Sequence, residues 1–128
     1  MTTDKFIKTG IFFCLTAVIL GAFGAHSLKQ VLTEKQLSSF QTGINYQFLH
    51  GLVILILSLN ATYFTSKLNG ILKMMIAGII LFSFSIYLLT IQDILGFSMS
   101  FMGPITPIGG LLLISAWIML FFSIKKQA

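Results

Sequence analysis

Polar side chains that could bind a ligand or move a proton gather at one end of the apolar segments of this chain. They are, in chain order, His26, Gln47, His50, Tyr87, Asp93 and Thr106. Imidazole, amide, phenol and carboxylate groups in or near lipid cost free energy, and they usually persist for packing or for a function. The set therefore marks one end of the protein as the place for a candidate polar pocket.

His50 has the widest range of chemistry in this set. It lies about six residues inside the second apolar segment, which corresponds to about 9 Å of helix, and Tyr87 should lie at a similar depth. A hydrogen bond from His50 to Tyr87 or Gln47 is the simplest interpretation. Proton transfer by the imidazole is a second interpretation, because histidine titrates near neutral pH. A metal site formed with His26 and Asp93 is a third.

Several reaction classes find no support in the sequence. No His pair at i, i+4 supports a metal site, so we predict neither a metal ion nor another cofactor. No Ser/His/Asp or Cys/His arrangement, phosphate-binding glycine loop or dinucleotide fingerprint is evident. No apolar segment has a carboxylate near its middle, which argues against a small proton-coupled exporter. We therefore predict a protein that is not an enzyme.

The composition explains which elements must position these side chains. Of the 128 residues 56% are hydrophobic and 9% are charged, whereas soluble domains carry about 25% charged residues. A membrane helix needs roughly 20 apolar residues, and four segments qualify: 7–26, 44–64, 71–91 and 105–124. None shows the alternation of a barrel strand. We predict a single all-α membrane domain, 1–128, with four transmembrane helices in a compact antiparallel bundle.

The lysines predict the orientation of this bundle. Eight lysines, no arginine and three acidic residues give a net charge of +5. The lysines form no patch with interleaved aromatic residues, so we predict no nucleic-acid partner. The side of the membrane that holds both termini and the link between the second and third segments collects six lysines: Lys5, Lys8, Lys67, Lys73, Lys125 and Lys126. Because positive residues favour the cytoplasm, we expect a multi-pass protein of the bacterial inner membrane with both termini cytoplasmic and the polar end outward.

The connection between the first and second segments contains a helix-start signal. Thr33 is followed three residues later by Gln36, as in a capping box. Leu37 and Phe40 then recur at helical spacing. We expect a short amphipathic interfacial helix here, running into the second span with Gly43 as a bend. It either covers the outer end of the bundle or docks on the membrane surface.

Small residues predict where helices approach one another. Ala17, Gly21 and Ala25 form a stripe on the first segment, and such stripes allow close backbone contact in lipid. The stripe could serve packing within the bundle or between two copies. The full set of expected packing positions is Ala17, Gly21, Gly24, Ala25, Gly43, Gly51, Gly78, Gly109 and Gly110.

The fourth segment begins with Thr106, Pro107 and two glycines. Thr106 is expected to cap this helix, with Pro107 at its first position, where the missing N–H costs nothing. A broken segment of the kind found in transporter binding sites is the alternative.

Motifs along the whole chain resemble one family of small membrane proteins. They are Gly21-Ala22-Phe23-Gly24-Ala25-His26, Thr42-Gly43, Tyr46-Gln47, His50, Tyr87-Leu88-Leu89, Gly103-Pro104-Ile105-Thr106-Pro107-Ile108-Gly109-Gly110 and Trp117. This combination resembles the transmembrane protein 256 family, whose bacterial members form domain-of-unknown-function family 423. Phe84 stands where the family pattern has a glycine, and the 96–103 loop is longer than in that pattern. The resemblance implies a four-span membrane protein and supplies no catalytic residues.

Two functional hypotheses follow from the sequence. The first is a non-enzymatic membrane component that packs with the lipid bilayer, with a second copy of itself or with a membrane-protein partner. The alternative is a small binder or conductor of a small molecule or proton, with an outward-facing polar pocket. The residues of this pocket would be His26, Gln47, His50, Tyr87, Asp93 and Thr106.

Overall fold

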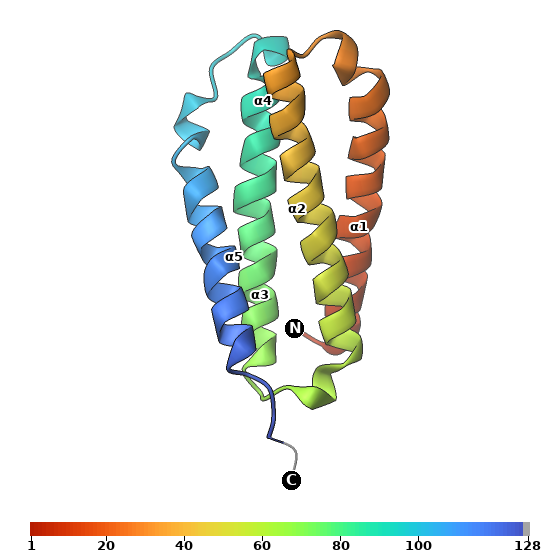
Figure 1. Ribbon diagram of the computed structural model, residues 1–128, viewed down its shortest axis with the longest axis vertical. Coiled ribbons are helices and arrows are strands. Elements are labelled where there is room, and N and C mark those ends of the chain that lie inside the picture. The colour runs from red at the N-terminus through yellow and green to blue at the C-terminus, as the bar shows by residue number, and fades with distance from the viewer. Residues whose placement is uncertain (127–128) are drawn as a thin grey trace.

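Four long antiparallel helical segments form an elongated bundle in the computed structural model, which describes residues 1–126 (Figure 1). The first is α1 (Thr3–His26) and the second is α2 (Glu34–Leu59). The third comprises α3 (Leu68–Ile79), the π-helical segment η3 (Ile80–Phe84) and α4 (Ser85–Leu95), and the fourth is α5 (Ile105–Phe121). Short 3-10 turns lie in the connections: η1 (Leu28–Gln30), η2 (Ala61–Tyr63) and η4 (Ser100–Met102). Four stretches of helix are long and apolar enough to cross a membrane. The predicted all-α four-span bundle is therefore confirmed.

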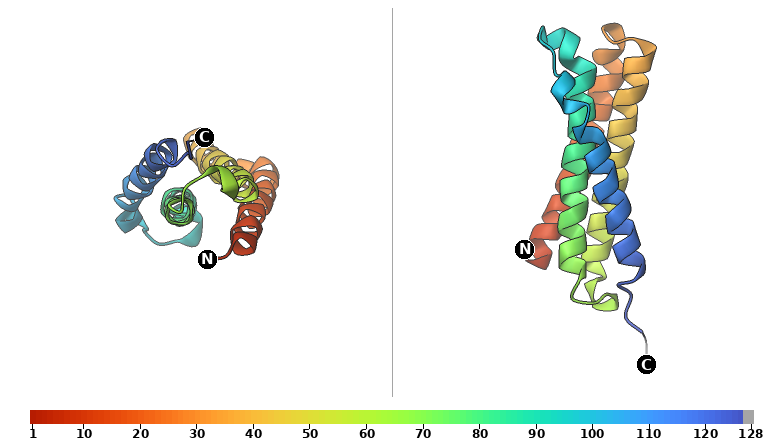
Figure 2. Two further views of the ribbon diagram at one scale, coloured as in Figure 1. Left: turned by 90° about the horizontal axis from the view of Figure 1, so that it is seen from below. Right: turned by 90° about the vertical axis from the view of Figure 1, so that its left-hand side faces the viewer.

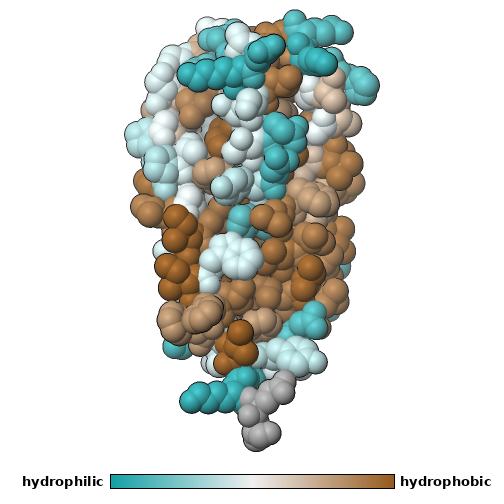
Figure 3. All heavy atoms as spheres, in the orientation of Figure 1, coloured by the Kyte–Doolittle hydropathy of each residue, from teal (hydrophilic) through white to brown (hydrophobic). Residues whose placement is uncertain are grey.

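The outer surface has the polarity expected of a membrane protein. On the face drawn in Figure 3, hydrophobic residues cover most of the lower half, while hydrophilic residues lie at the two ends and extend from the upper end toward the middle. Large apolar side chains such as Phe12, Leu111 and Phe121 are more than half exposed. In a bilayer these side chains would meet lipid and not water, so their exposure carries no penalty.

The predicted capping box at the start of α2 is confirmed. The Thr33 hydroxyl accepts from the Gln36 backbone N–H at 3.2 Å, and Gln36 Oε1 accepts from the Thr33 N–H at 2.9 Å. The separate interfacial helix with a bend at Gly43 is not observed. α2 continues unbroken through Gly43, because Phe40 and Ile44 are buried against the rest of the bundle, which holds this turn in line with the span.

α1 packs on α2 through small residues at seven-residue spacing. Gly10, Ala17 and Gly24 are all buried on the face toward α2. A Cβ on Gly10 would lie 2.8 Å from the carbonyl oxygen of Gly51, and one on Gly24 would lie 3.2 Å from the Phe40 ring. The predicted stripe is therefore shifted: Gly21 is half-buried and Ala25 is exposed. Small residues at these positions let the two backbones approach closely, as is common between membrane helices.

The third span is not a regular α-helix. Ile80–Phe84 is π-helical, so the chain gains an extra residue within one turn and the faces of α3 and α4 are offset. This segment lies against Gly109 of α5, whose added Cβ would be 2.4 Å from the backbone nitrogen of Phe82. The close approach of α5 and the π-helical turn thus depends on a glycine at position 109.

The end of the bundle that carries both termini is closed by the C-terminal tail. The segment after α5 turns back onto the α2–α3 connection, where Thr65 N–H donates to the Ser123 carbonyl at 2.8 Å. Lys125 N–H donates to the Tyr63 carbonyl at 3.0 Å, and Phe64 pairs with Ile124 as an antiparallel bridge. The views in Figure 2 show the tail, the α2–α3 connection and the N-terminus at this same end.

Candidate functional site

Gln47 is the centre of a hydrogen-bond network that joins three helices. Its Nε2 donates to the Phe13 carbonyl at 3.0 Å and to Thr16 Oγ1 at 2.7 Å, both on α1. Its Oε1 accepts from the Tyr87 hydroxyl of α4 at 2.8 Å. The Thr16 hydroxyl donates in turn to the Phe12 carbonyl oxygen at 2.8 Å. Both amide hydrogens and the amide oxygen of Gln47 are therefore used inside the protein.

His50 belongs to a second network, between α2 and α5. The Trp117 indole N–H donates to His50 Nε2 at 3.0 Å, and His50 Nδ1 lies 2.8 Å from the Tyr46 carbonyl oxygen. An indole nitrogen can only donate, so Nε2 must carry no proton and Nδ1 must carry it. The imidazole is thus neutral, with both nitrogens paired. The Tyr46 ring stacks on it at a centroid distance of 5.9 Å.

This arrangement corrects the expected partner of His50. Tyr87 bonds Gln47 and does not bond His50, whereas Trp117 takes the place predicted for Tyr87. The similar depth of His50 and Tyr87 was the basis of that prediction. Depth alone does not fix the direction of a side chain around the helix, and α2 presents Gln47 to α1 and α4 but His50 to α5.

Two further hydrogen bonds fix the π-helical segment and α4 to their neighbours. The Ser83 hydroxyl donates to the carbonyl oxygen of Gly43 at 2.7 Å. The Ser85 and Thr106 hydroxyl oxygens are 2.6 Å apart, and Ser85 also lies 2.6 Å from the Leu81 carbonyl oxygen. Because a carbonyl can only accept, Ser85 donates to Leu81 and Thr106 donates to Ser85.

Thr106 therefore does not cap the fourth span. α5 begins at Ile105, its N-cap residue is Pro104, and no side chain caps it. Thr106 already lies in the first turn of α5, where its side chain is directed to α4 and not to its own helix. Pro107 is inside this first turn, two residues after the start of the helix.

His26 and Asp93 lie apart from the two networks. His26 is exposed at the last residue of α1. Asp93 is exposed near the end of α4, where its carboxylate accepts from Gln36 Nε2 at 3.1 Å. Among residues 1–126 there is no cluster of three or more histidine, cysteine or acidic side chains that could hold a metal ion. The structure thus does not bring His26, His50 and Asp93 together.

The six candidate residues are divided among separate places, and no single cavity unites them. Gln47 and Tyr87 reach a groove of about 550 Å³ between α1 and α4, which is otherwise lined mainly by apolar side chains such as Phe12 and Phe84. Thr106 lines a different hollow of about 530 Å³, together with Lys35 and Gln92. A third hollow of about 530 Å³ lies beside Asp93 and the α4–α5 loop.

Several residues that organise these contacts were not among the candidates. Thr16, Ser83 and Trp117 complete the networks, and Gly10 lies where α1 closely approaches the backbone of α2. The seven-residue spacing of Gly10, Ala17 and Gly24 was a usable signal for that last position. The other three had no local signal, because each finds its partner on a helix distant in sequence.

The fold and these internal networks define a small four-span helical membrane protein. The model of the family described as "Protein of unknown function (DUF423)" matches residues 20–110, and the chain belongs to this family. It is similar to the UPF0382 membrane protein YwdK of Bacillus subtilis, with 38% identity over 127 residues, 94% of this chain and 96% of the relative. The UPF0382 membrane protein SH2409 of Staphylococcus haemolyticus is 36% identical over 121 residues, 94% of this chain and 95% of the relative. A UPF0382 membrane protein of Haemophilus influenzae is 37% identical over 116 residues, 91% of this chain and 87% of the relative. No solved structure matches the chain significantly.

Proposed function

We propose that this protein is a non-enzymatic component of the bacterial cytoplasmic membrane, which acts through its outer surfaces on lipid and on other membrane proteins or a second copy of itself. The observation that carries this proposal is the pairing of the intramembrane polar groups with one another. Gln47 has no free donor, and both nitrogens of His50 are engaged. Groups paired in this way stabilise the bundle, and they are not free to bind a substrate or relay a proton without breaking a bond.

A flux measurement separates this proposal from conduction. The purified protein is reconstituted in liposomes that contain a pH-sensitive dye, and an outward proton gradient is imposed. We expect proton flux equal to that of protein-free liposomes, because the Trp117–His50 and Gln47–Tyr87 bonds leave no continuous chain of free groups. Flux that rises with the protein-to-lipid ratio, and falls when His50 is replaced by leucine in a protein that still folds, would contradict the proposal.

The proposed orientation places both termini in the cytoplasm. It is supported by the six lysines at that end, since positive residues favour the cytoplasmic side. Cys14 is the single cysteine, so a Cys14→Ala background permits labelling at new positions. Ser98→Cys and Ser66→Cys place a thiol on exposed residues at opposite ends. In intact spheroplasts a membrane-impermeant maleimide should label the Ser98→Cys variant and not the Ser66→Cys variant. The reverse pattern would show that both termini face outward.

Binding of a small polar molecule at the outer end is the second candidate function. The hollow beside Thr106 favours it, because Lys35, Gln36 and Gln92 converge there from α2 and α4. The Thr106 hydroxyl donates to Ser85 and keeps both lone pairs for ligand hydrogens, and Lys35 is exposed. A structure determined in lipid would test this candidate: density for a bound molecule in the hollow supports it, and side chains that fill the hollow oppose it.

A further inference from the structure

The positive charge of the protein belongs to one end of the bundle. Lys29 and Lys35 lie at the α1–α2 connection, and they are balanced at that end by Glu34 and Asp93. The net charge of +5 is therefore carried by the end with the termini, where Asp4 is the single acidic residue. A cluster of four to eight lysines beside a membrane span attracts anionic lipids.

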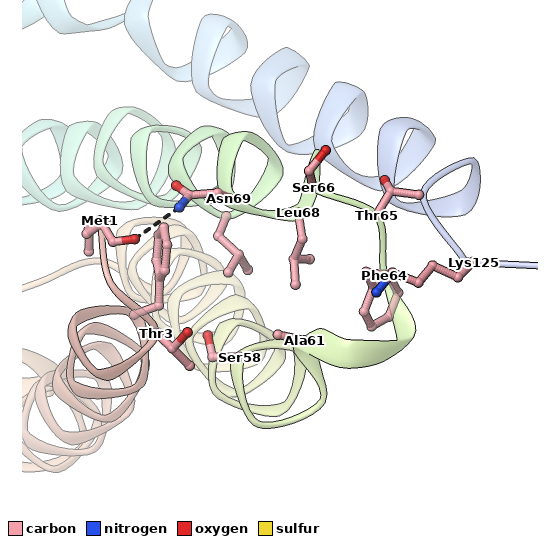
Figure 4. A pocket seen from close by; sticks show the side chains of 12 residues that line it. Met1, Thr3, Ser58, Ala61, Phe64, Thr65, Ser66, Leu68, Asn69 and Lys125 are labelled. Atoms are coloured by element: carbon pink, nitrogen blue, oxygen red, sulfur yellow. Dashed lines mark hydrogen bonds between the residues drawn. The ribbon is translucent and has the colours of Figure 1, made fainter.

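A cavity lies at this same end. It has a volume of about 380 Å³ and is bounded by the start of α1, the end of α2, the α2–α3 connection, the start of α3 and the C-terminal tail (Figure 4). Apolar side chains such as Phe6, Leu68 and Leu72 form one part of its lining. In Figure 4, Thr65 and Lys125 lie on the right of the picture, away from Met1 and Thr3. A cavity with an apolar part and a cationic edge is suited to an amphiphile.

Lys125 is held at this edge by the fold. Its backbone N–H donates to the Tyr63 carbonyl at 3.0 Å, and its ammonium donates to the Thr62 carbonyl at 2.9 Å. An ammonium group has three donors, so two remain for another acceptor. The tail thus places a partly satisfied positive charge at a defined position beside the cavity, with less side-chain entropy to lose on binding than a free lysine.

From these observations we infer that the end of the bundle with the termini binds an anionic phospholipid, with the phosphate beside Lys125 and the apolar part of the lipid against Phe6 and Leu72. The phosphate oxygens would accept from the Lys125 ammonium. This inference names one lipid class as a partner within the proposed function. It does not depend on which side of the membrane this end faces.

Lipid titration of the purified protein tests whether the positive charge of Lys125 contributes to lipid binding. The protein in a nonionic detergent is titrated with phosphatidylglycerol or with phosphatidylcholine, and bound lipid is counted by native mass spectrometry. We expect phosphatidylglycerol to bind more tightly, and Lys125→Gln to weaken its binding about fivefold, since one lysine near an anionic surface contributes about that factor. Lys35→Gln is the matched control, because it removes one exposed lysine at the opposite end. Equal binding of the two lipids, or equal loss in both variants, would overturn the inference.

Discussion

Gly109→Ala should destabilise the folded protein by about 3 kcal/mol or more, because its new Cβ would collide with backbone atoms. The Cβ would lie 2.4 Å from the Phe82 nitrogen and 2.7 Å from the Leu81 carbonyl carbon. A flexible side chain could move aside, but these atoms belong to the π-helical turn of the third span. α5 would have to move away from α3 and η3 as a unit, with loss of contacts along their interface. Thermal unfolding in detergent micelles, followed by circular dichroism, measures the effect.

The next residue provides a matched control. A Cβ on Gly110 would meet the Phe82 ring at 3.7 Å, which is ordinary van der Waals contact. Alanine also favours a helix over glycine by about 1 kcal/mol, so Gly110→Ala should leave stability unchanged or raise it slightly. Equal effects of the two substitutions would mean that α5 does not approach the backbone of the π-helical turn closely at Gly109.

Gln47→Leu should lower the free energy of unfolding by about 1–2 kcal/mol, the second largest effect that we expect. Leucine matches the size of glutamine but leaves the Tyr87 hydroxyl without its acceptor and Thr16 without its donor. Hydrogen bonds between membrane helices contribute about 0.6 kcal/mol on average and up to about 1.7. A buried group left without a partner adds to that loss. The measurement is reversible unfolding in mixed micelles.

A double-mutant cycle shows whether the Gln47–Tyr87 pair itself is responsible. Tyr87→Phe removes the hydroxyl and leaves Gln47 Oε1 unpaired, so it should also destabilise the protein. The double variant lacks both partners and should lose less than the sum of the two single losses. Gln41→Leu is the control, since Gln41 is exposed on the same helix and bonds only its neighbour Asn45. Additive losses would show that Gln47 and Tyr87 act independently of each other.

These two sites also illustrate how much of the fold was predictable. Long apolar segments with flanking lysines predicted four helices and their antiparallel order, because a bilayer admits a chain of this composition only as spanning helices. Thr33 and Gln36 predicted the start of α2, because a capping box is complete within four residues. The packing role of Gly51, Gly78 and Gly109 also followed from residue type, since each allows close contact wherever a second helix crosses.

For the candidate site, the sequence predicted which residues form hydrogen bonds but not which partners they bond. Gln47, His50 and Tyr87 were expected to make hydrogen bonds inside the membrane, and each of them does. Their partners were not predictable, because a partner depends on how helices are rotated about their axes. The π-helical turn at Ile80–Phe84 adds to this difficulty, since it offsets the residues after it and has no strong signature in the sequence.

By itself the sequence determined that this chain forms four membrane helices with polar residues toward one end and positive charge at the other. These properties follow from the free energy of placing each residue in lipid, at the interface or in water, which depends on residue type and position along the chain. Only the tertiary structure decided that the polar residues pair in separate networks and that Lys125 and Thr65 lie beside one cavity. Such contacts join residues far apart in the chain, and their geometry depends on how all four spans pack together.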